Sequence, residues 1–301
     1  MKRKLPNFLI VGAERSGTTS LYYYLMEHPQ IFLPKRKECR FFSNMSGNHR
    51  GPGDEYMNNS IIKNIKDYKF LFEGVSKEKA IGDISPDYLY FYKNSINNIN
   101  KYLISPKIII ILRDPIKRAY SNYFLHIREG REKLSFEEAI KEDENRRNQN
   151  WAWGWYFVDV GFYYNQVKAY LDNFDQLKVY LYDDLKKDTL NLVKNIYEFL
   201  GVDTLFTPDI NIRYNASGIP KNKFVHKFLK EPNILKNLVK PFAKILIPQE
   251  KRRKIIEKIR SRNLQRPQMK SETREYLKNL YQEDILKLQD LIKRDLNNWL
   301  E

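Results

Sequence analysis

The stretch FLIVGAERSGTTSLYYYLMEH constrains this chain more than any other feature, because it reads as a strand, a glycine loop and a helix in succession. Residues 8–11 form an apolar run that ends at Gly12, and residues 20–28 have helical spacing. Gly12 and Gly17 have the spacing of a nucleotide-binding P-loop, but Thr18 stands where that pattern requires lysine. The loop is therefore either an accidental match or a phosphate site that uses a different ligand.

A second unit of the same kind begins at KIIIIL, residues 107–112, a β-branched run typical of a strand buried on both faces. Asp114 is suited to the N-cap of the following helix, and Pro115 to its first position. We therefore expect a helix over residues 116–129. The chain then contains two strand–turn–helix units whose turns carry polar residues.

Other segments continue this alternation of strands and helices. Short buried strands are expected at 80–85 and 177–182, and helices at 162–174 and 189–201. Such alternation predicts a parallel sheet with helices on both faces, and ligands bind these sheets at the carboxyl ends of the strands. From about residue 223 the pattern is helical and basic. We predict one α/β domain over residues 1–301, built of three layers around a central parallel sheet, with a helical C-terminal portion.

The net charge of +16 admits a nucleic-acid-binding protein, since basic surfaces attract phosphate-bearing partners. The charge is spread along the chain, and no helix-turn-helix, zinc-finger or RNA-recognition pattern is found. We therefore favour an anionic small-molecule site and expect no nucleic-acid partner. No apolar run approaches the roughly 20 residues that cross a bilayer, so no transmembrane segment is expected. The single cysteine, Cys39, excludes an intramolecular disulfide and favours a cytoplasmic location.

The glycine loop can bind an anion without the missing lysine. Backbone N–H groups from Ala13 to Thr19 lie at the positive end of a helix, and the hydroxyls of Thr18 and Thr19 add donors. Arg15 supplies a cation with several N–H donors. A P-loop kinase is an alternative, but it needs Mg²⁺ and an acidic residue at a second strand end, where this chain has Arg113. We expect no metal site.

A second anion site is expected where the 107–112 strand ends. Arg113 follows this strand, and Ser121 lies on the next helix, so both could bind one phosphate. The alternative is that Arg113 and Asp114 form an ion pair that only fixes the turn. Two anion sites at neighbouring strand ends suggest a ligand that carries phosphate at both ends, and ATP is not built in this way.

The two motifs GAERSGTTSL and LRDPIKRAYSNY together resemble the 5′- and 3′-phosphate-binding motifs of sulfotransferases that use 3′-phosphoadenosine 5′-phosphosulfate, PAPS. The resemblance continues through PKRKECRFFS, IGDISPDYLY, GFYYNQVKAYLDNF, YLYDDL and RDLNNWL. It is closest to the glycan sulfotransferases of the heparan type and their bacterial relatives. It implies a P-loop-like α/β fold and sulfuryl transfer from PAPS to an acceptor hydroxyl on a carbohydrate, with 3′-phosphoadenosine 5′-phosphate, PAP, as the product.

By this resemblance the first loop binds the 5′-phosphosulfate, and Arg113 and Ser121 bind the 3′-phosphate. The residues of the first loop are Arg15, Ser16, Gly17, Thr18, Thr19 and Ser20. Heparan-type members usually carry lysine at the position of Arg15. Because arginine does not readily donate a proton, we assign Arg15 the electrostatic stabilisation of the transferring group. Sulfotransferases commonly close a late basic loop over the nucleotide, which implies Lys221 and Lys223 as further contacts.

Sulfuryl transfer to a hydroxyl also needs a group that takes the acceptor's proton, and a carboxylate suits this role. Glu38 matches the K-E-x-x-F-F pattern in which related glycan sulfotransferases place their catalytic glutamate. The alternative for Glu38 is a charge cluster on an exposed loop. Asp83 in IGDISP is the second candidate for the base.

Two features bear on the acceptor. Ile84 occupies a position where heparan-type members carry a functional lysine, which puts a heparan-like acceptor in doubt. The aromatic run WAWGWYF, residues 151–157, fits a surface that stacks on sugars, and it equally fits a core beneath a long loop. The acceptor is therefore expected to be a carbohydrate only by resemblance.

Overall fold

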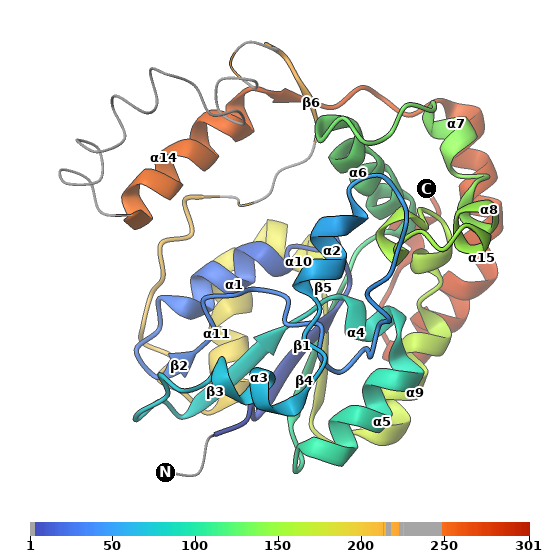
Figure 1. The fold of residues 1–301 in the computed structure, drawn as a ribbon. Helices are drawn as coiled ribbons and strands as arrows, with labels where there is room; N and C mark the ends of the chain where they lie inside the picture. Colours follow the sequence, from blue (N-terminus) through green and yellow to red (C-terminus); the bar gives the residue numbers. More distant parts are fainter. Residues whose placement is uncertain (1–3, 213, 215–217, 223–224, 226–248) are drawn as a thin grey trace.

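A computed structural model describes residues 4–212, 214, 218–222, 225 and 249–301 (Figure 1). Its centre is a five-stranded parallel sheet in the order β2-β3-β1-β4-β5. The strands are β1 (Phe8–Gly12), β2 (Ile31–Phe32), β3 (Ala80–Ile84), β4 (Lys107–Leu112) and β5 (Leu177–Leu181). The predicted parallel sheet is confirmed, and β4 has the predicted bounds.

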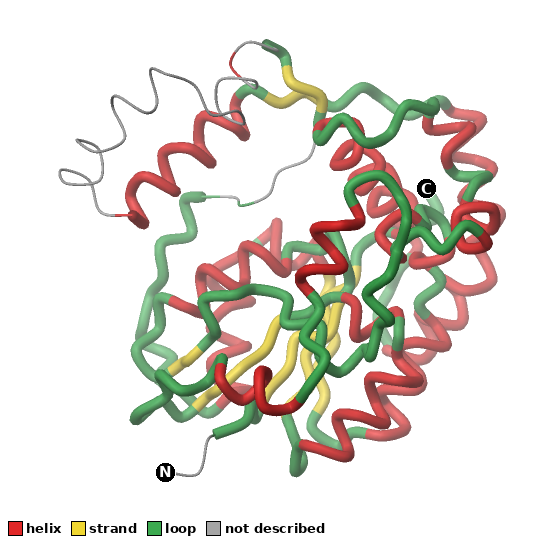
Figure 2. Tube along the Cα trace, viewed as in Figure 1, coloured by secondary structure: helices red, strands yellow, loops and turns green. Residues whose placement is uncertain are grey.

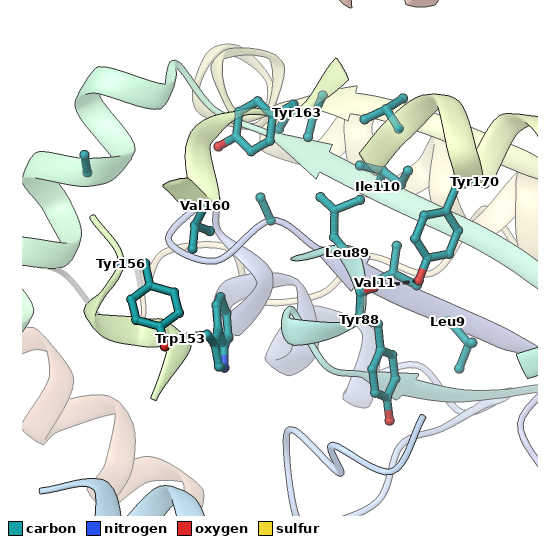
Figure 3. Packing of buried hydrophobic residues seen from close by; sticks show 14 of the residues in the cluster. Leu9, Val11, Tyr88, Leu89, Ile110, Trp153, Tyr156, Val160, Tyr163 and Tyr170 are labelled. Carbon is teal, nitrogen blue, oxygen red and sulfur yellow. Dashed lines mark hydrogen bonds between the residues drawn. The ribbon is translucent and has the colours of Figure 1, made fainter. Parts of the chain in front are cut away.

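Helices cover both faces of the sheet, as Figure 2 shows. Side chains alternate between the faces of a strand, so β1 contributes to two separate cores. Phe8 and Ile10 pack beneath α1 (Thr18–Met26) and α11 (Thr189–Leu200). Leu9 and Val11 belong to the opposite core (Figure 3). The helices that contribute to that core include α4 (Asp87–Tyr90), α5 (Tyr92–Tyr102), α6 (Pro115–Arg128), α9 (Tyr164–Asn173) and α15 (Ser271–Ile292). The three-layer arrangement follows from this division.

The ends of two helices match the signals in the sequence. The Asp114 carboxylate accepts hydrogen bonds from the backbone N–H groups of Ile116 at 2.9 Å and Lys117 at 3.1 Å, which confirms it as the N-cap of α6. Gly201 ends α11 with a φ of 75°, a left-handed conformation that glycine adopts at low cost. These two caps fix where the chain enters and leaves helices that pack on the sheet.

The strand expected at 177–182 is present as β5, but the expectation that it is buried is wrong. β5 is the edge strand of the sheet, and only Leu181 among its residues is buried, while Lys178 is exposed. An edge strand has one neighbouring strand instead of two, so fewer of its side chains are covered. A short apolar run does not distinguish the two situations.

Further short helices, together with the longer α14, complete the helical part of the described residues. They are α2 (Asp54–Ser60), α3 (Ile65–Phe70), α7 (Phe136–Ala139), α8 (Asp143–Asn148), η1 (Trp153–Trp155), η2 (Asp159–Gly161), α10 (Tyr182–Lys187), α14 (Gln249–Arg262) and η3 (Asn297–Trp299). Two short strands, β6 (Ile219–Pro220) and β7 (Leu264–Gln265), pair antiparallel above the sheet in Figure 1. Within the described ranges, no helix combines the length and the apolarity that crossing a membrane requires.

Candidate active site

The loop after β1 is shaped by Gly17, which immediately precedes α1. Its φ is 94°, a conformation that other residues adopt only with strain. A Cβ atom at this position would also lie 2.6 Å from Leu185 Cδ2 on α10. The loop therefore packs closely against α10. The N-terminal end of α1 carries a partial positive charge, and its residues Thr18 and Thr19 line the cleft described below.

Two hydrogen bonds join the two predicted anion-binding motifs. Arg15 Nε donates to Ser121 Oγ at 3.3 Å. Arg113 Nη1 donates to the backbone oxygen of Arg15 at 2.9 Å, and its guanidinium lies 4.9 Å from the ring centroid of Tyr182. The ends of β1 and β4 thus form one site, in which Arg113 is committed to the loop and not to an ion pair with Asp114.

These residues line one cleft of about 630 Å³. The acidic side chains in its wall are Glu14, Glu38, Asp54 and Glu129. The basic side chains outnumber them and are Arg15, Arg40, Arg113, Arg128, Arg131, Lys186 and Arg266. The cleft is therefore suited to an anionic ligand.

Arg15 shows how strongly this environment acts on a charge. Burial lowers the pKa of its guanidinium to about 9, with Glu14 opposing the change and the charges of Arg128 and Arg113 adding to it. At neutral pH the side chain is still charged. A bound anion would be attracted by several guanidinium groups that repel one another in its absence.

The first-loop residues do not all face the cleft. Gly17, Thr18, Thr19 and Ser20 line it together with Arg15. Ser20 Oγ also accepts a hydrogen bond from the backbone N–H of Tyr214 at 3.2 Å. Ser16 is fully buried and is not in the cleft wall. Its backbone N–H donates to the Ala13 oxygen at 3.3 Å, so the structure gives Ser16 a role in the turn.

The late basic loop is only partly described. Lys221 is exposed and does not line the cleft, although its backbone N–H donates to the Asn263 oxygen at 2.7 Å and so ties it to the segment before Arg266. Lys223 lies outside the described residues. The described basic residue that this part of the chain contributes to the cleft is Arg266.

Glu38 is in the cleft wall, with 29% of its side chain exposed. Its two carboxylate oxygens pair with Lys37 and Arg40. Its backbone N–H donates to the Ile84 oxygen at 3.2 Å, which fixes the loop beside the end of β3. Burial alone would raise the pKa of Glu38, but the Lys37 and Arg40 charges outweigh it and lower the pKa to about 2. Glu38 is therefore an ionised carboxylate at the cleft.

Asp83 has a different environment. It is fully buried in β3 and is not in the cleft wall. Its carboxylate accepts hydrogen bonds from Tyr68 Oη at 2.9 Å, Ser85 Oγ at 2.8 Å and Tyr88 Oη at 2.7 Å. Burial raises the pKa of Asp83 despite these donors. The geometry favours Glu38 over Asp83 as the group that meets an acceptor.

The sequence pattern of the sulfotransferase domain matches residues 5–289. The chain belongs to the sulfotransferase family. A sulfotransferase of known structure from Alicyclobacillus acidocaldarius superposes with a TM-score of 0.78 at 33% identity, covering 99% of this chain and 100% of that one. The P-loop-like fold and the family resemblance are thereby confirmed.

Two curated relatives resemble parts of this chain. The membrane-associated sulfotransferase kil1 of Dictyostelium discoideum is 34% identical over 148 residues, 46% of this chain and 28% of that protein. The human bifunctional heparan sulfate N-deacetylase/N-sulfotransferase 3 is 30% identical over 210 residues, 66% of this chain and 22% of that protein. The matched regions span about a quarter of the length of each relative.

The aromatic run at residues 151–157 lies mainly in the core, so for most of its residues the interpretation as core is confirmed over that of a sugar-stacking surface. Trp153 and Tyr156 belong to the buried cluster (Figure 3). Trp155 is 1% exposed, and its Nε1–H donates to Asp54 Oδ1 at 3.1 Å. Trp155 still forms part of the cleft wall beside Gly154. The segment thus supports the cleft from below and exposes little aromatic surface.

Several cleft residues of the sulfotransferase were not predicted from the sequence, namely Glu14, Arg40, Arg128, Arg131, Lys186 and Arg266. Arg40 lies two residues after Glu38 in the same quoted motif, and Glu14 lies inside the loop, so both were within reach of sequence reasoning. Arg266 is remote in sequence and has no such signal. In the described ranges, no group of three or more His, Cys, Asp or Glu side chains could hold a metal ion.

Proposed function

We propose that this protein transfers a sulfuryl group from PAPS to a hydroxyl of a carbohydrate acceptor and releases PAP. The observation that carries the proposal is the meeting of two anion-binding motifs in one cleft. Arg15 of the first motif contacts Ser121 of the second at 3.3 Å. A donor with phosphate groups at both ends of its ribose fits such a pair of sites better than a linear triphosphate.

The residues of the cleft fit this donor. The N–H groups of the loop, with the hydroxyls of Thr18 and Thr19, would hold the 5′-phosphosulfate. Arg113 and Ser121 would hold the 3′-phosphate, and Arg266 adds positive charge close to Arg15. The excess of basic side chains in the cleft wall offsets the negative charge at both ends of this donor.

Arg15 would stabilise the negative charge that develops as the sulfuryl group leaves the phosphate. Its guanidinium is held in place by Ser121 before the ligand arrives, so little reorganisation is needed during the reaction. A bound anion favours the charged form and would raise its pKa from about 9. Arg15 therefore remains a cation throughout.

Glu38 would take the proton of the acceptor hydroxyl. It lines the cleft, its carboxylate is ionised, and the loop that carries it is fixed to β3. A carboxylate with a pKa of about 2 is a weak base. Negative charge on the bound donor would raise that pKa and would compete for Lys37 and Arg40, which makes Glu38 a better proton acceptor in the complex.

A carbohydrate acceptor is supported by two cleft residues and by the relatives. Tyr56 is 72% exposed at the cleft, and Arg131 can bind hydroxyl or acidic groups. One relative is named for heparan sulfate. The cytoplasmic location that the single cysteine favours stays a prediction.

Calorimetric titration tests the donor. We expect PAP to bind at least ten-fold more tightly than ADP, since ADP lacks the 3′-phosphate that Arg113 and Ser121 would bind. Equal affinities would refute the assignment of the second anion site. Transfer of labelled sulfate from PAPS to a panel of glycans, lipids, phenols and peptides then tests the acceptor, and preference for a non-carbohydrate hydroxyl would refute that part of the proposal.

A further inference from the structure

Glu14 is one of the four carboxylates in the cleft wall, and it is neither the assigned base nor a partner of Arg113 or Ser121. It lies in the first loop immediately before Arg15. Its Oε2 is buried and accepts no hydrogen bond from any residue that the structure describes. A buried, ionised oxygen without a partner is costly, whereas a protonated carboxyl group at this place is tolerated and can serve as a donor to a ligand.

The charged groups around Glu14 come from three elements. Arg118 belongs to α6, Arg15 to the same loop, and Glu38 and Arg40 to the segment that follows β2. Burial raises the pKa of Glu14 and prevails over the lowering effect of Arg118 and Arg15, with Glu38 adding to the rise.

Two of the carboxyl groups in the cleft wall, those of Glu14 and Glu38, therefore differ in protonation. The pKa of Glu14 is raised, and that of Glu38 is lowered to about 2. Two carboxyl groups whose environments push their pKa values apart are the usual arrangement for an acid and a base in one active site. Glu38 is the ionised member and Glu14 is the member that can hold a proton.

An anionic donor would strengthen this difference. Its negative charges would engage Arg15, which with Arg118 and Arg40 is one of the three cations that lower the pKa of Glu14. They would also disfavour ionisation of Glu14 directly. Binding of the donor should therefore protonate Glu14 further, while Arg15 stays charged and keeps its protons.

We propose that Glu14 is a catalytic proton donor, which gives its proton to the 5′-phosphate oxygen as the sulfuryl group leaves. The proposal rests on the proposed function above. It assigns the proton to a neighbour of Arg15, because a guanidinium that binds an anion is a poor acid.

In the proposed transfer, the acceptor oxygen forms a bond to sulfur and loses its proton to the Glu38 carboxylate. The bond between sulfur and the bridging oxygen breaks, its electron pair passes to that oxygen, and the oxygen takes the Glu14 proton. Glu38 then releases a proton to solvent and Glu14 takes one up, so that the enzyme is restored.

The first test measures the number of protons taken up when PAP binds, and it does not require sulfate transfer. PAP is titrated into the wild-type protein and into Glu14→Gln by calorimetry in buffers of different ionisation enthalpy, between about pH 5 and pH 9. We expect the wild type to take up more protons on binding than the variant at some pH in this range. Equal proton counts at every pH would overturn the proposal.

The second test measures kcat. We expect Glu14→Gln to lower kcat by about 10²-fold or more and to remove the fall of kcat at alkaline pH, because the amide has no proton to lose. Glu283→Gln on the exposed side of α15 is the matched control and should leave both readouts unchanged. A variant that keeps the alkaline fall or the wild-type kcat would overturn the role.

Glu14→Asp keeps an ionisable group on a shorter side chain. If Glu14→Gln does not fold, the aspartate variant carries the same tests, with proton uptake expected and kcat reduced. Unreduced kcat in Glu14→Asp, or no proton uptake, counts against the proposal. If the wild-type protein binds no PAP and transfers no sulfate, the proposed function fails and the role of Glu14 fails with it. If the wild type is active and the Glu14 variant is equally active, only the role of Glu14 as proton donor is rejected.

Discussion

Replacing Glu38 by glutamine should affect both activity and stability, because this side chain is at once the assigned base and the partner of two cations. Its carboxylate pairs with Lys37 and with Arg40, whose side chain is 7% exposed. The amide of glutamine is uncharged and cannot neutralise either group. Arg40 would then be left as a largely buried cation that has lost its nearest carboxylate.

The magnitude follows from the pKa of Glu38, which lies at about 2 in the folded protein against an ordinary value of 4.5. At about 1.4 kcal/mol per pH unit, this difference contributes about 3 kcal/mol to the free energy of unfolding at neutral pH. Since the pKa is lower in the folded state, the contribution is complete above pH 4.5 and is lost as the pH falls towards 2. At pH 3.5 it should be about 2 kcal/mol.

Urea unfolding of the wild type and of Glu38→Gln at pH 7 and pH 3.5 measures this difference, with Glu283→Gln as a control for loss of an exposed ion pair. We expect the gap between wild type and Glu38→Gln to narrow at the lower pH and the control to stay close to the wild type. For folded Glu38→Gln, kcat should fall by about 10²–10⁴-fold relative to the wild type, while the affinity for PAP changes little. A gap that is constant with pH would refute the electrostatic reasoning, and undiminished turnover would refute the role as base.

Three further substitutions test the site. Gly17→Ala should lower the free energy of unfolding in urea by about 1–3 kcal/mol, because Gly17 has a φ of 94° and an added Cβ would lie 2.6 Å from Leu185. Gly154→Ala, which adds its methyl group to open space, is the control. Equal stabilities of the two variants would contradict this. Arg113→Ala should weaken PAP binding by about 10–100-fold in calorimetry and abolish the preference for PAP over ADP, and a preserved preference would place the 3′-phosphate elsewhere. Asp83→Asn should lower stability by about 1–3 kcal/mol, since one amide oxygen cannot serve three hydroxyl donors, with kcat per folded molecule reduced less than ten-fold. Loss of kcat at unchanged stability would restore Asp83 as a catalytic candidate.

Local signals in the sequence predicted the elements of the fold well. The β-branched run at 107–112 became β4, and Asp114 and Pro115 began α6 as expected. These features depend on neighbouring residues, so a single sequence contains them. The position of β5 at the edge of the sheet depends on strand order, and only the fold determines which strand receives one neighbour.

The cleft was predictable where its residues lie in short motifs near strand ends. Arg15 and Arg113 follow β1 and β4, Ser121 lies on the helix after β4, and the parallel sheet brings the three together. Arg266 reaches the same cleft through the pairing of β6 with β7, a contact between segments more than forty residues apart that no local pattern encodes. Asp83 is the opposite case, because its place in a motif did not reveal that three hydroxyls surround it in the core.

Arg15 stands where heparan-type sulfotransferases usually carry lysine, and this exchange explains why protonation should be divided between neighbouring residues of the loop. A lysine in such a site can both attract an anion and donate a proton, since its pKa shifts readily. Arg15 retains the attraction, and its contact with Ser121 couples the loop to the second anion site, but it gives up proton donation. The adjacent Glu14 has the raised pKa that this second task requires. Exchanging Arg15 for lysine should therefore make Glu14 less necessary, so the loss of kcat caused by Glu14→Gln should be smaller in an Arg15→Lys background than in the wild type.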